Sequence, residues 1–148
     1  MMDRSQIERL IPHRPPFLWI DQVADLEPGV RCVALKYVDP AEPFFLGHFP
    51  EQAILPGVFL IEAVAQTAGV MLAGSINSEG RPRLAAVNRF KFLKPVGPGS
   101  ELRIETRKLA DFEGMASIEG TVHVGSDIVG RGELTVVSVP DCNAEPED

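Results

Sequence analysis

Cysteine is scarce in this sequence. Of 148 residues only Cys32 and Cys142 are cysteines, they do not form a CxxC pair, and Cys142 lies in a polar tail. Disulfide frameworks and structural zinc sites require more numerous or more closely spaced cysteines. We therefore expect neither kind of site, and this scarcity favours a reducing cytoplasm as the location.

Positive charge is also in short supply. The 14 lysine and arginine residues are outnumbered by 21 aspartate and glutamate residues, which gives a formal net charge of -7. Proteins that bind nucleic acids neutralise phosphates with a surplus of basic side chains. The charge balance therefore argues against a nucleic-acid binder.

No segment has the pattern of an export signal or a membrane span. The N-terminal residues MMDRSQIERLIPHRPPF contain charges and prolines where a signal peptide needs an uninterrupted apolar stretch. The long apolar run over 57–73 has 17 residues and includes Glu62 and Gln66. A bilayer span needs roughly 17–25 apolar residues, so we expect a buried helix of a soluble protein instead.

The length and composition fit one globular domain. Hydrophobic residues make up 45% of the 148 residues and charged residues 24%, close to the averages for soluble domains. We expect a single domain over 1–139. The acidic, proline-containing segment 140–148 is predicted to be a disordered tail.

Hydrophobic periodicity and turn residues predict two strands, one long helix and four more strands, in that order. A short helix over 3–10 comes first, with Asp3 as its N-cap and with Ile7 and Leu10 facing inward. Residues 39–56 contain four prolines and three phenylalanines, which predicts an irregular but packed loop. The long helix should begin at Pro56-Gly57 and end at residue 73, and the expected strands are 17–26, 30–38, 84–92, 101–109, 115–124 and 128–139.

A helix that is apolar on nearly all faces must be enclosed. With six strands available, the economical arrangement is one curved antiparallel sheet wrapped around the helix, which is an α+β fold. Such a sheet has an open edge and covers the helix only in part. We therefore expect a symmetric dimer.

Two titratable residues lie in apolar surroundings. His48 sits in FFLGHFP over 44–50, and Glu62 lies inside the apolar run, which contains no lysine or arginine. A lone histidine of this kind is about as often structural as functional. A glutamate is rarely buried without a partner, and burial disfavours its ionised form. Glu62 is therefore suited to donate a proton, and a neutral His48 is suited to accept one.

The start of the long helix offers a third group. Pro56 has no N–H to lose in the first turn, and Gly57 lets a substrate carbonyl approach the free amides at the positive end of the helix dipole. A base, an acid and an oxyanion site at one helix end match a β-elimination from a thioester. In that reaction, loss of the α-proton places charge on the carbonyl oxygen. This spacing alone is only moderately specific for an enzyme that catalyses such an elimination.

Three segments in order carry a family resemblance. They are IPHRPPFLWID over 11–21, EPFFLGHFP with LPGVFLIEAVAQ over 42–66, and FLKPVGPG over 92–99. In these segments the chain resembles the 3-hydroxyacyl-[acyl-carrier-protein] dehydratases of bacterial fatty-acid synthesis, the FabZ type of the hot-dog superfamily. The resemblance covers most of the chain and implies a hot-dog fold.

The resemblance also implies roles for single residues. His48 would be the catalytic base, Glu62 its partner on the central helix, and the Gly57 amide the group that polarises the thioester carbonyl. The pair would be built across a homodimer, with its two residues from different subunits, and the dimers would assemble as hexamers. No metal or organic cofactor is implied, because phosphopantetheine arrives with the acyl carrier protein as part of the substrate.

The chain departs from the family pattern in two places. Residues 51–55 read EQAIL where the family has GHPVM or similar, and residues 88–95 read NRFKFLKP where it has an Asp-x-Ala-Arg-Phe-Lys-Arg-Pro stretch. Related isomerising dehydratases carry Asp in place of Glu62, which favours a simple dehydratase here. Acyl chain length, and fatty-acid synthesis as against polyketide or polyene synthesis, stay open.

The sequence indicates the roles of three other polar residues less directly. His13 belongs to the family pattern, and we expect it to cap or anchor the N-terminal loop. His123 is expected on a strand surface. Gln66, one turn after Glu62, can either orient the carboxyl by a hydrogen bond or make a polar contact in a dimer.

Basic residues are concentrated over 81–94. This stretch contains no Asp or Glu, and its basic residues are Arg81, Arg83, Arg89, Lys91 and Lys94. They form either a solvated strand face or a docking patch for an acidic carrier protein. Our docking hypothesis assigns Arg89, Lys91 and Lys94 to the patch.

Three functions are compatible with these residues. The first is a dehydratase that converts a (3R)-3-hydroxyacyl carrier-protein thioester into the trans-2-enoyl product. The second is a thioesterase of the same fold, in which the helix carboxylate activates water. The third is a non-catalytic acyl-binding subunit. The spacing of His48 and Glu62 favours the first.

Overall fold

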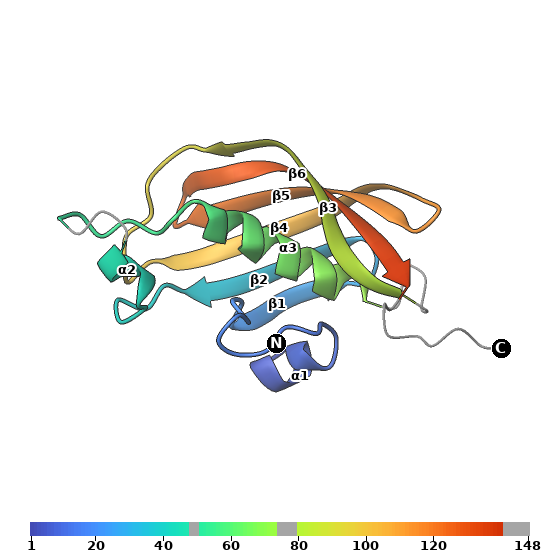
Figure 1. Cartoon of the computed structure of the whole chain (residues 1–148), viewed down its shortest axis with the longest axis horizontal. Coiled ribbons are helices and arrows are strands. Elements are labelled where there is room, and N and C mark those ends of the chain that lie inside the picture. Colours follow the sequence, from blue (N-terminus) through green and yellow to red (C-terminus); the bar gives the residue numbers. More distant parts are fainter. Residues whose placement is uncertain (48–50, 74–79, 141–148) are drawn as a thin grey trace.

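The structure, a computed structural model, describes residues 1–47, 51–73 and 80–140. Six strands form one antiparallel sheet in the order β1-β2-β4-β5-β6-β3, and helix α3 lies against one of its faces (Figure 1). The expected α+β architecture is thereby confirmed. In chain order the elements are α1 (Arg4–Glu8), β1 (Gln22–Glu27), β2 (Arg31–Tyr37), α2 (Phe44–Gly47), α3 (Val58–Leu72), β3 (Gly80–Phe92), β4 (Glu101–Phe112), β5 (Met115–Val124) and β6 (Asp127–Pro140).

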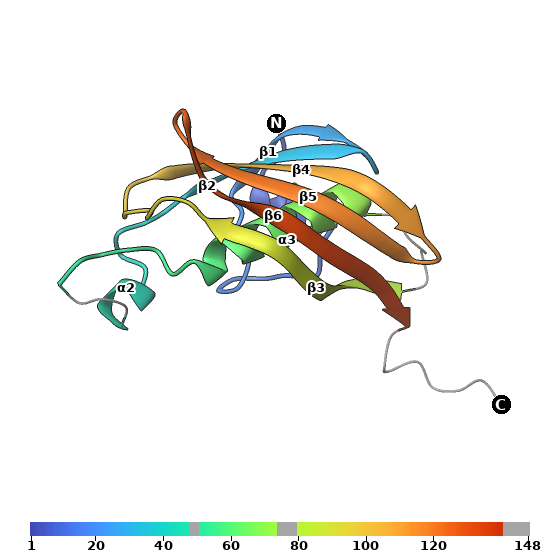
Figure 2. The same cartoon turned by 90° about the horizontal axis from the view of Figure 1, so that it is seen from above.

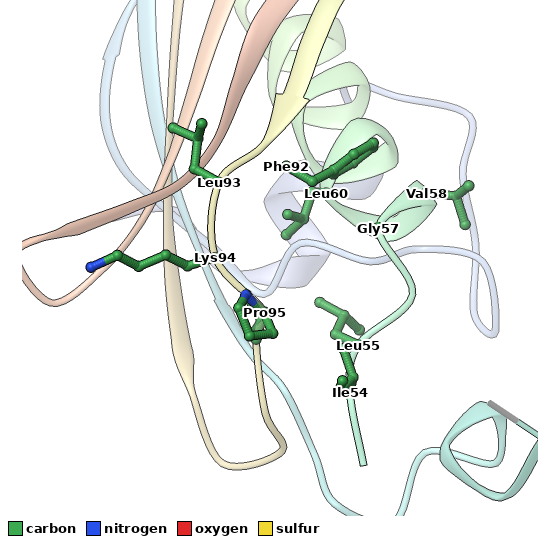
Figure 3. Close-up of a pocket in the computed structure, with 10 residues that line it drawn as sticks. Ile54, Leu55, Gly57, Val58, Leu60, Phe92, Leu93, Lys94 and Pro95 are labelled. Atoms are coloured by element: carbon green, nitrogen blue, oxygen red, sulfur yellow. The ribbon is translucent and has the colours of Figure 1, made fainter. Parts of the chain in front are cut away.

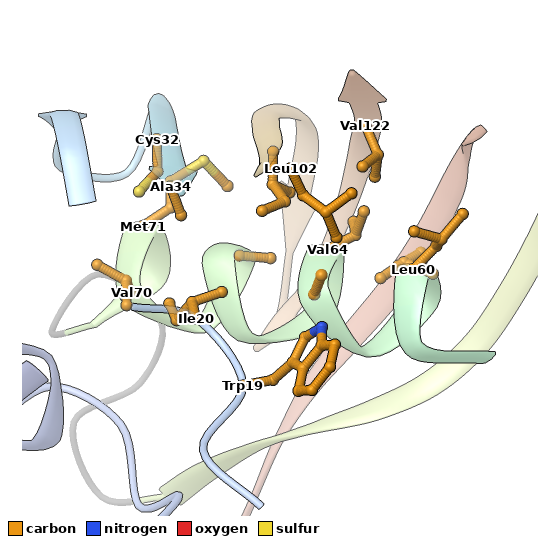
Figure 4. Packing of buried hydrophobic residues seen from close by; sticks show 14 of the residues in the cluster. Trp19, Ile20, Cys32, Ala34, Leu60, Val64, Val70, Met71, Leu102 and Val122 are labelled. Carbon is orange, nitrogen blue, oxygen red and sulfur yellow. The ribbon is translucent and has the colours of Figure 1, made fainter. Parts of the chain in front are cut away.

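The sheet bends across α3, and the hydrophobic core lies between them (Figure 2). Strand residues such as Leu102 and Val122 pack on one side of the helix, while Trp19 and Ile20 cover its other side (Figure 4). The helix approaches the sheet closely because β5 carries a glycine opposite it. A Cβ atom on Gly120 would lie 2.3 Å from Cγ1 of Val64.

The N-terminal helix is shorter than predicted. It spans Arg4–Glu8, and Asp3 is its N-cap, as expected; the structure adds that Asp3 forms a capping box with Gln6. Ile7 is fully buried, but Leu10 is 37% exposed, so the prediction that Leu10 faces inward was wrong. The reason is that Leu10 lies beyond the last helical turn and no longer shares the face of Ile7.

The first strand starts later than predicted, at Gln22 in place of residue 17. The backbone amide of Trp19 donates to Oε1 of Gln66 at 2.8 Å, so this part of the segment is bound to α3, and contact with β2 begins at Asp21, whose amide donates to the Leu35 carbonyl at 2.9 Å. The short helix α2 lies in the loop predicted to be irregular. The remaining strands are present, with β3 and β4 longer than expected.

The predicted disordered tail lies at the margin of the described residues. Positions 141–148, including Cys142, lie outside them, so the domain boundary at residue 139 stays a prediction. Cys32 is buried on β2, and desolvation raises the pKa of its thiol to about 12. Within the described ranges, no helix is both long enough and apolar enough to cross a bilayer.

Candidate active site

Glu62 lies on α3 at the border of a cavity. The cavity has a volume of about 240 Å³ and is enclosed by residues 11–13, by α3 and by strands β3 and β6. The Glu62 side chain is 24% exposed in the single chain, and its Oε1 accepts a hydrogen bond of 2.8 Å from Nε2 of Gln66. A carboxyl group that is held in place at the border of a cavity can exchange a proton with a ligand bound there.

Gln66 is fully buried, and its amide is held from three sides. Its Oε1 accepts from the Trp19 amide at 2.8 Å, and its Nε2 donates to the Phe17 carbonyl at 3.0 Å as well as to Glu62. The hydrogen bond to Glu62 that the sequence suggested is therefore present. Because the donors and acceptors of Gln66 are used within its own chain, the structure favours this interpretation over a dimer contact.

His13 lies closer to Glu62 than the sequence indicated. Its Nε2 is 3.7 Å from Oε1 of Glu62, and its ring stacks on Phe17 with a centroid distance of 5.9 Å. We expected a residue that anchors the N-terminal loop. The proximity depends on how residues 11–20 fold back over α3, and no local pattern in the sequence indicates that path.

Gly57 lies at the N-cap of α3 beside a second cavity, of about 410 Å³. Within the described residues its amide forms no hydrogen bond, as expected for the free N–H groups at the start of a helix. Figure 3 shows Ile54 and Leu55 on one side of this cavity and Lys94 and Pro95 on the other. The cavity is largely apolar, and the Gly57 amide, a backbone donor at the positive end of the helix dipole, borders it.

Gly57 and Glu62 face different cavities of the same chain. Five residues at about 100° each place them about 140° apart around the helix axis. The residues that line the two cavities do not overlap. Within one chain, therefore, the predicted acid and the predicted oxyanion donor are not brought together.

His48 lies outside the described residues, so its role as the base stays a prediction. The helix that precedes it, α2, is anchored to α3 through aromatic packing. The ring of Phe44 stacks on that of Phe59 at a centroid distance of 4.4 Å, and both lie against Trp19. The chain leading up to His48 is thus fixed to the helix that carries Glu62.

The three predicted docking residues fall at two places. Arg89 and Lys91 are exposed on β3 and line a shallow cavity with Arg131 of β6. Lys94 pairs with Asp127 at 2.9 Å and borders the Gly57 cavity instead. The predicted patch is therefore divided between the surface of the sheet and the entrance beside Gly57.

The remaining polar residues add little to the site. His123 is only partly exposed on β5, and its Nδ1 is buried with no hydrogen-bond partner in the described part of the chain, so it is not a simple surface residue. Across the described ranges, no cluster of three or more His, Cys, Asp or Glu side chains could hold a metal ion. That the reaction needs no metal or cofactor stays a prediction.

Comparison with known proteins assigns this chain to a family. The model of the FabA-like domain matches residues 11–133. A 3-hydroxyacyl-[acyl-carrier-protein] dehydratase FabZ of Geotalea uraniireducens is 42% identical over 136 residues, which are 90% of this chain and 94% of that protein. The protein of the same name from Staphylococcus saprophyticus is 47% identical over 106 residues, 71% of this chain and 73% of that protein.

Solved structures show the same fold. A chain of the dehydratase heterocomplex ApeI:P from Xenorhabdus doucetiae superposes with a TM-score of 0.77 at 22% identity, covering 91% of both chains. Cj0977, a sigma28-regulated virulence protein from Campylobacter jejuni, superposes with a TM-score of 0.70 at 14% identity, covering 93% of this chain and 90% of its own. The hot-dog fold implied by the sequence is confirmed.

Proposed function

The chain belongs to the FabA-like domain family, and from that premise we propose that it is a 3-hydroxyacyl-[acyl-carrier-protein] dehydratase, a carbon–oxygen lyase of fatty-acid biosynthesis. One observation carries the proposal. The carboxyl of Glu62, at the position the family resemblance predicts, is held by Gln66 at the border of a cavity. The scarcity of cysteine and the proposed carrier-protein substrate support a cytoplasmic location.

The proposed reaction is a β-elimination. His48 takes the α-proton of the 3-hydroxyacyl thioester, the Gly57 amide stabilises the charge on the carbonyl oxygen, and Glu62 gives a proton to the departing hydroxyl. The α-carbon–hydrogen and β-carbon–oxygen bonds break, the carbon–carbon double bond forms, and water leaves. The electrons balance within the substrate, so the step needs no oxidant or reductant.

The direct test follows the absorbance of the enoyl product with a series of 3-hydroxyacyl carrier-protein substrates. The wild-type protein should form the enoyl thioester, and H48A and E62Q should each lower kcat by about 10²–10⁴-fold with unchanged Tm. Glu62→Gln keeps the shape of the side chain and removes only its acid function. Release of free thiol would identify a thioesterase, and tight binding without turnover would identify an acyl-binding subunit.

We further propose that each active site is shared between two copies of the chain. Gly57 and Glu62 of one chain line separate cavities. A single substrate can therefore contact both groups only if Gly57 comes from one subunit and Glu62 from the other. A two-fold symmetric dimer brings the same surface of each chain together and completes two equivalent sites.

The surfaces needed for this dimer are uncovered in the single chain. Strand β3 pairs with β6 alone among the described residues, and its other edge is open. On α3, Val58 is 67% exposed, and Ile61 and Ala65 are only partly buried. Exposed apolar residues beside an open strand edge are typical of an interface, and the occupant we propose is a second copy of the chain.

The acyl carrier protein is the proposed partner that delivers the substrate. The relatives named above are dehydratases of acyl-carrier-protein substrates. Arg89 and Lys91 present positive charge on β3, and Arg131 of β6 adds to it within the same shallow cavity, which Glu119 and Glu133 also line. A surface with more cations than carboxylates, on a protein of net charge -7, is suited to an acidic partner.

Charge reversal tests this docking surface. The variant R89E/K91E should raise KM for the carrier-bound substrate while leaving the turnover of a free N-acetylcysteamine thioester unchanged. The matched control, R103E/R107E, makes the same change in charge at exposed positions of β4. An equal loss with both substrates, or an equal effect of the control, would contradict the docking surface and leave the dehydratase proposal intact.

A further inference from the structure

A histidine that is not part of the proposed acid–base pair faces the carboxyl of Glu62. The Nε2 atom of His13 lies 3.7 Å from Oε1 of Glu62, and that same oxygen accepts the hydrogen bond from Gln66. Within the described residues, Oε2 of Glu62 accepts no hydrogen bond. The two oxygens are therefore different: Oε1 faces two nitrogen atoms, and Oε2 is left for a ligand in the cavity.

The orientation of the Gln66 amide determines which oxygen of Glu62 can carry a proton. Its Oε1 accepts from the backbone N–H of Trp19 at 2.8 Å, so its NH₂ group must be the end that faces Glu62. An N–H donor thus always points at Oε1 of Glu62. When the carboxyl is protonated, the proton must lie on Oε2, which is where a general acid needs it.

The surroundings of His13 favour a proton on Nε2 over one on Nδ1. The Nδ1 atom is buried and has no hydrogen-bond partner in the described part of the chain. A proton on Nδ1 would bury an N–H without an acceptor, which is costly. The Nε2 atom is therefore the N–H donor of the ring, and it faces Oε1 of Glu62.

We propose that His13 is a positioning residue for the dehydration: with Gln66 it holds Oε1 of Glu62 between two N–H donors and so directs Oε2, with its proton, at the hydroxyl of the substrate. This inference rests on the proposed function. At 3.7 Å the contact is longer than a hydrogen bond. Such contacts commonly shorten when substrate closes the site, so the distance allows a donor that engages during the reaction.

Three substitutions of one residue separate this role from a structural one. His13→Phe keeps a flat ring against Phe17 and removes both nitrogen atoms, so kcat should fall about ten- to a hundredfold while KM and Tm stay near wild type. His13→Gln restores an N–H donor and should recover part of kcat. His13→Leu replaces His13→Phe if the larger ring prevents folding. An unchanged kcat in a folded apolar variant would overturn the proposal.

His123 provides the matched control. Like His13 it has a buried Nδ1 without a partner in the described residues, but it lies on β5 and does not border the Glu62 cavity. His123→Phe should therefore leave kcat unchanged. An equal fall in kcat in H123F and H13F would show a general effect of removing a half-buried imidazole, and it would overturn the specific role of His13.

A spectroscopic measurement tests the contact without relying on turnover. At a pH low enough to protonate carboxyl groups, the infrared carbonyl stretch of Glu62 can be assigned by its loss in E62Q. It should move to higher wavenumber in H13F or H13L, because Oε1 loses a donor, and it should not move in H123F. A band that stays in place in every His13 variant would overturn the contact. If the wild-type protein dehydrates no 3-hydroxyacyl thioester, the proposed function fails, and this band still decides whether His13 acts on Glu62.

Discussion

Complementation between two inactive variants tests the shared active site directly. In the proposed dimer, one site uses His48 of the first chain and Glu62 of the second, and the other site uses the reverse pair. A mixed dimer of H48A with E62Q therefore contains one intact site and one site that lacks both groups. Each variant alone should be about 10²–10⁴-fold slower than wild type.

The magnitude follows from the symmetry of the dimer. Random exchange of equal amounts of the two variants makes half of the dimers mixed, and half of the sites in those dimers are intact. The mixture should then recover about a quarter of the wild-type kcat per chain. The assay is the enoyl-absorbance assay, read before and after the subunits are exchanged by mild denaturation and refolding.

A second mixture provides the control. When wild type is mixed with the double variant H48A/E62Q, mixed dimers have no intact site if the site is shared, so about a quarter of full activity remains. If each chain holds its own complete site, about half remains, and the H48A and E62Q mixture recovers nothing. That pair of results would refute the shared site and the geometric argument on which it rests.

Four further predictions concern two glycines and one cysteine. Gly120→Ala should lower Tm by roughly 3–10 °C in thermal unfolding, because its Cβ would lie 2.3 Å from the Val64 side chain, and adding Val64→Ala should restore part of the loss. Gly57→Ala should raise KM, because its Cβ would lie 2.9 Å from the ring of Phe92 and would displace that ring within the 410 Å³ cavity that both residues line. Since Phe92 is 53% exposed, its ring can shift and Tm should change little; a lower Tm with normal KM would contradict this. Cys32 should resist alkylation in the folded protein, as measured by mass spectrometry of its peptide, because its pKa is raised from 9.0 to about 12. Since the unfolded chain releases that proton first, the contribution of Cys32 to stability should be lost as the pH rises from about 9 towards 12.

The sequence predicted those parts of the fold whose signals are local. The N-cap at Asp3, the break between the first two strands and the start of the long helix after Pro56 all depend on residues within a few positions of one another. The segment over 17–21 was predicted as strand because its apolar residues have strand character. Its residues 17–20 are instead bound to Gln66, 47 positions from Trp19, and no local pattern indicates a hydrogen bond over that separation.

The site was predictable to a similar extent. The positions of Glu62 and Gly57 on one helix and the hydrogen bond from Gln66 follow from helical spacing. The approach of His13 to Glu62 does not, because it depends on the path of the N-terminal segment across α3. The division of the basic residues also needed the structure, since Lys94 lies beyond the end of β3 while Arg89 and Lys91 lie on the strand itself.

The spacing of five residues between Gly57 and Glu62 explains how one helix can serve two sites. A spacing of four or seven would place both groups near one face of α3, and a single chain would then hold donor and acid in one cavity. With a spacing of five residues, the Gly57 amide borders one cavity and the Glu62 carboxyl borders the other. In the proposed elimination, donor and acid can therefore meet on one substrate only where a second copy of the chain supplies one of them.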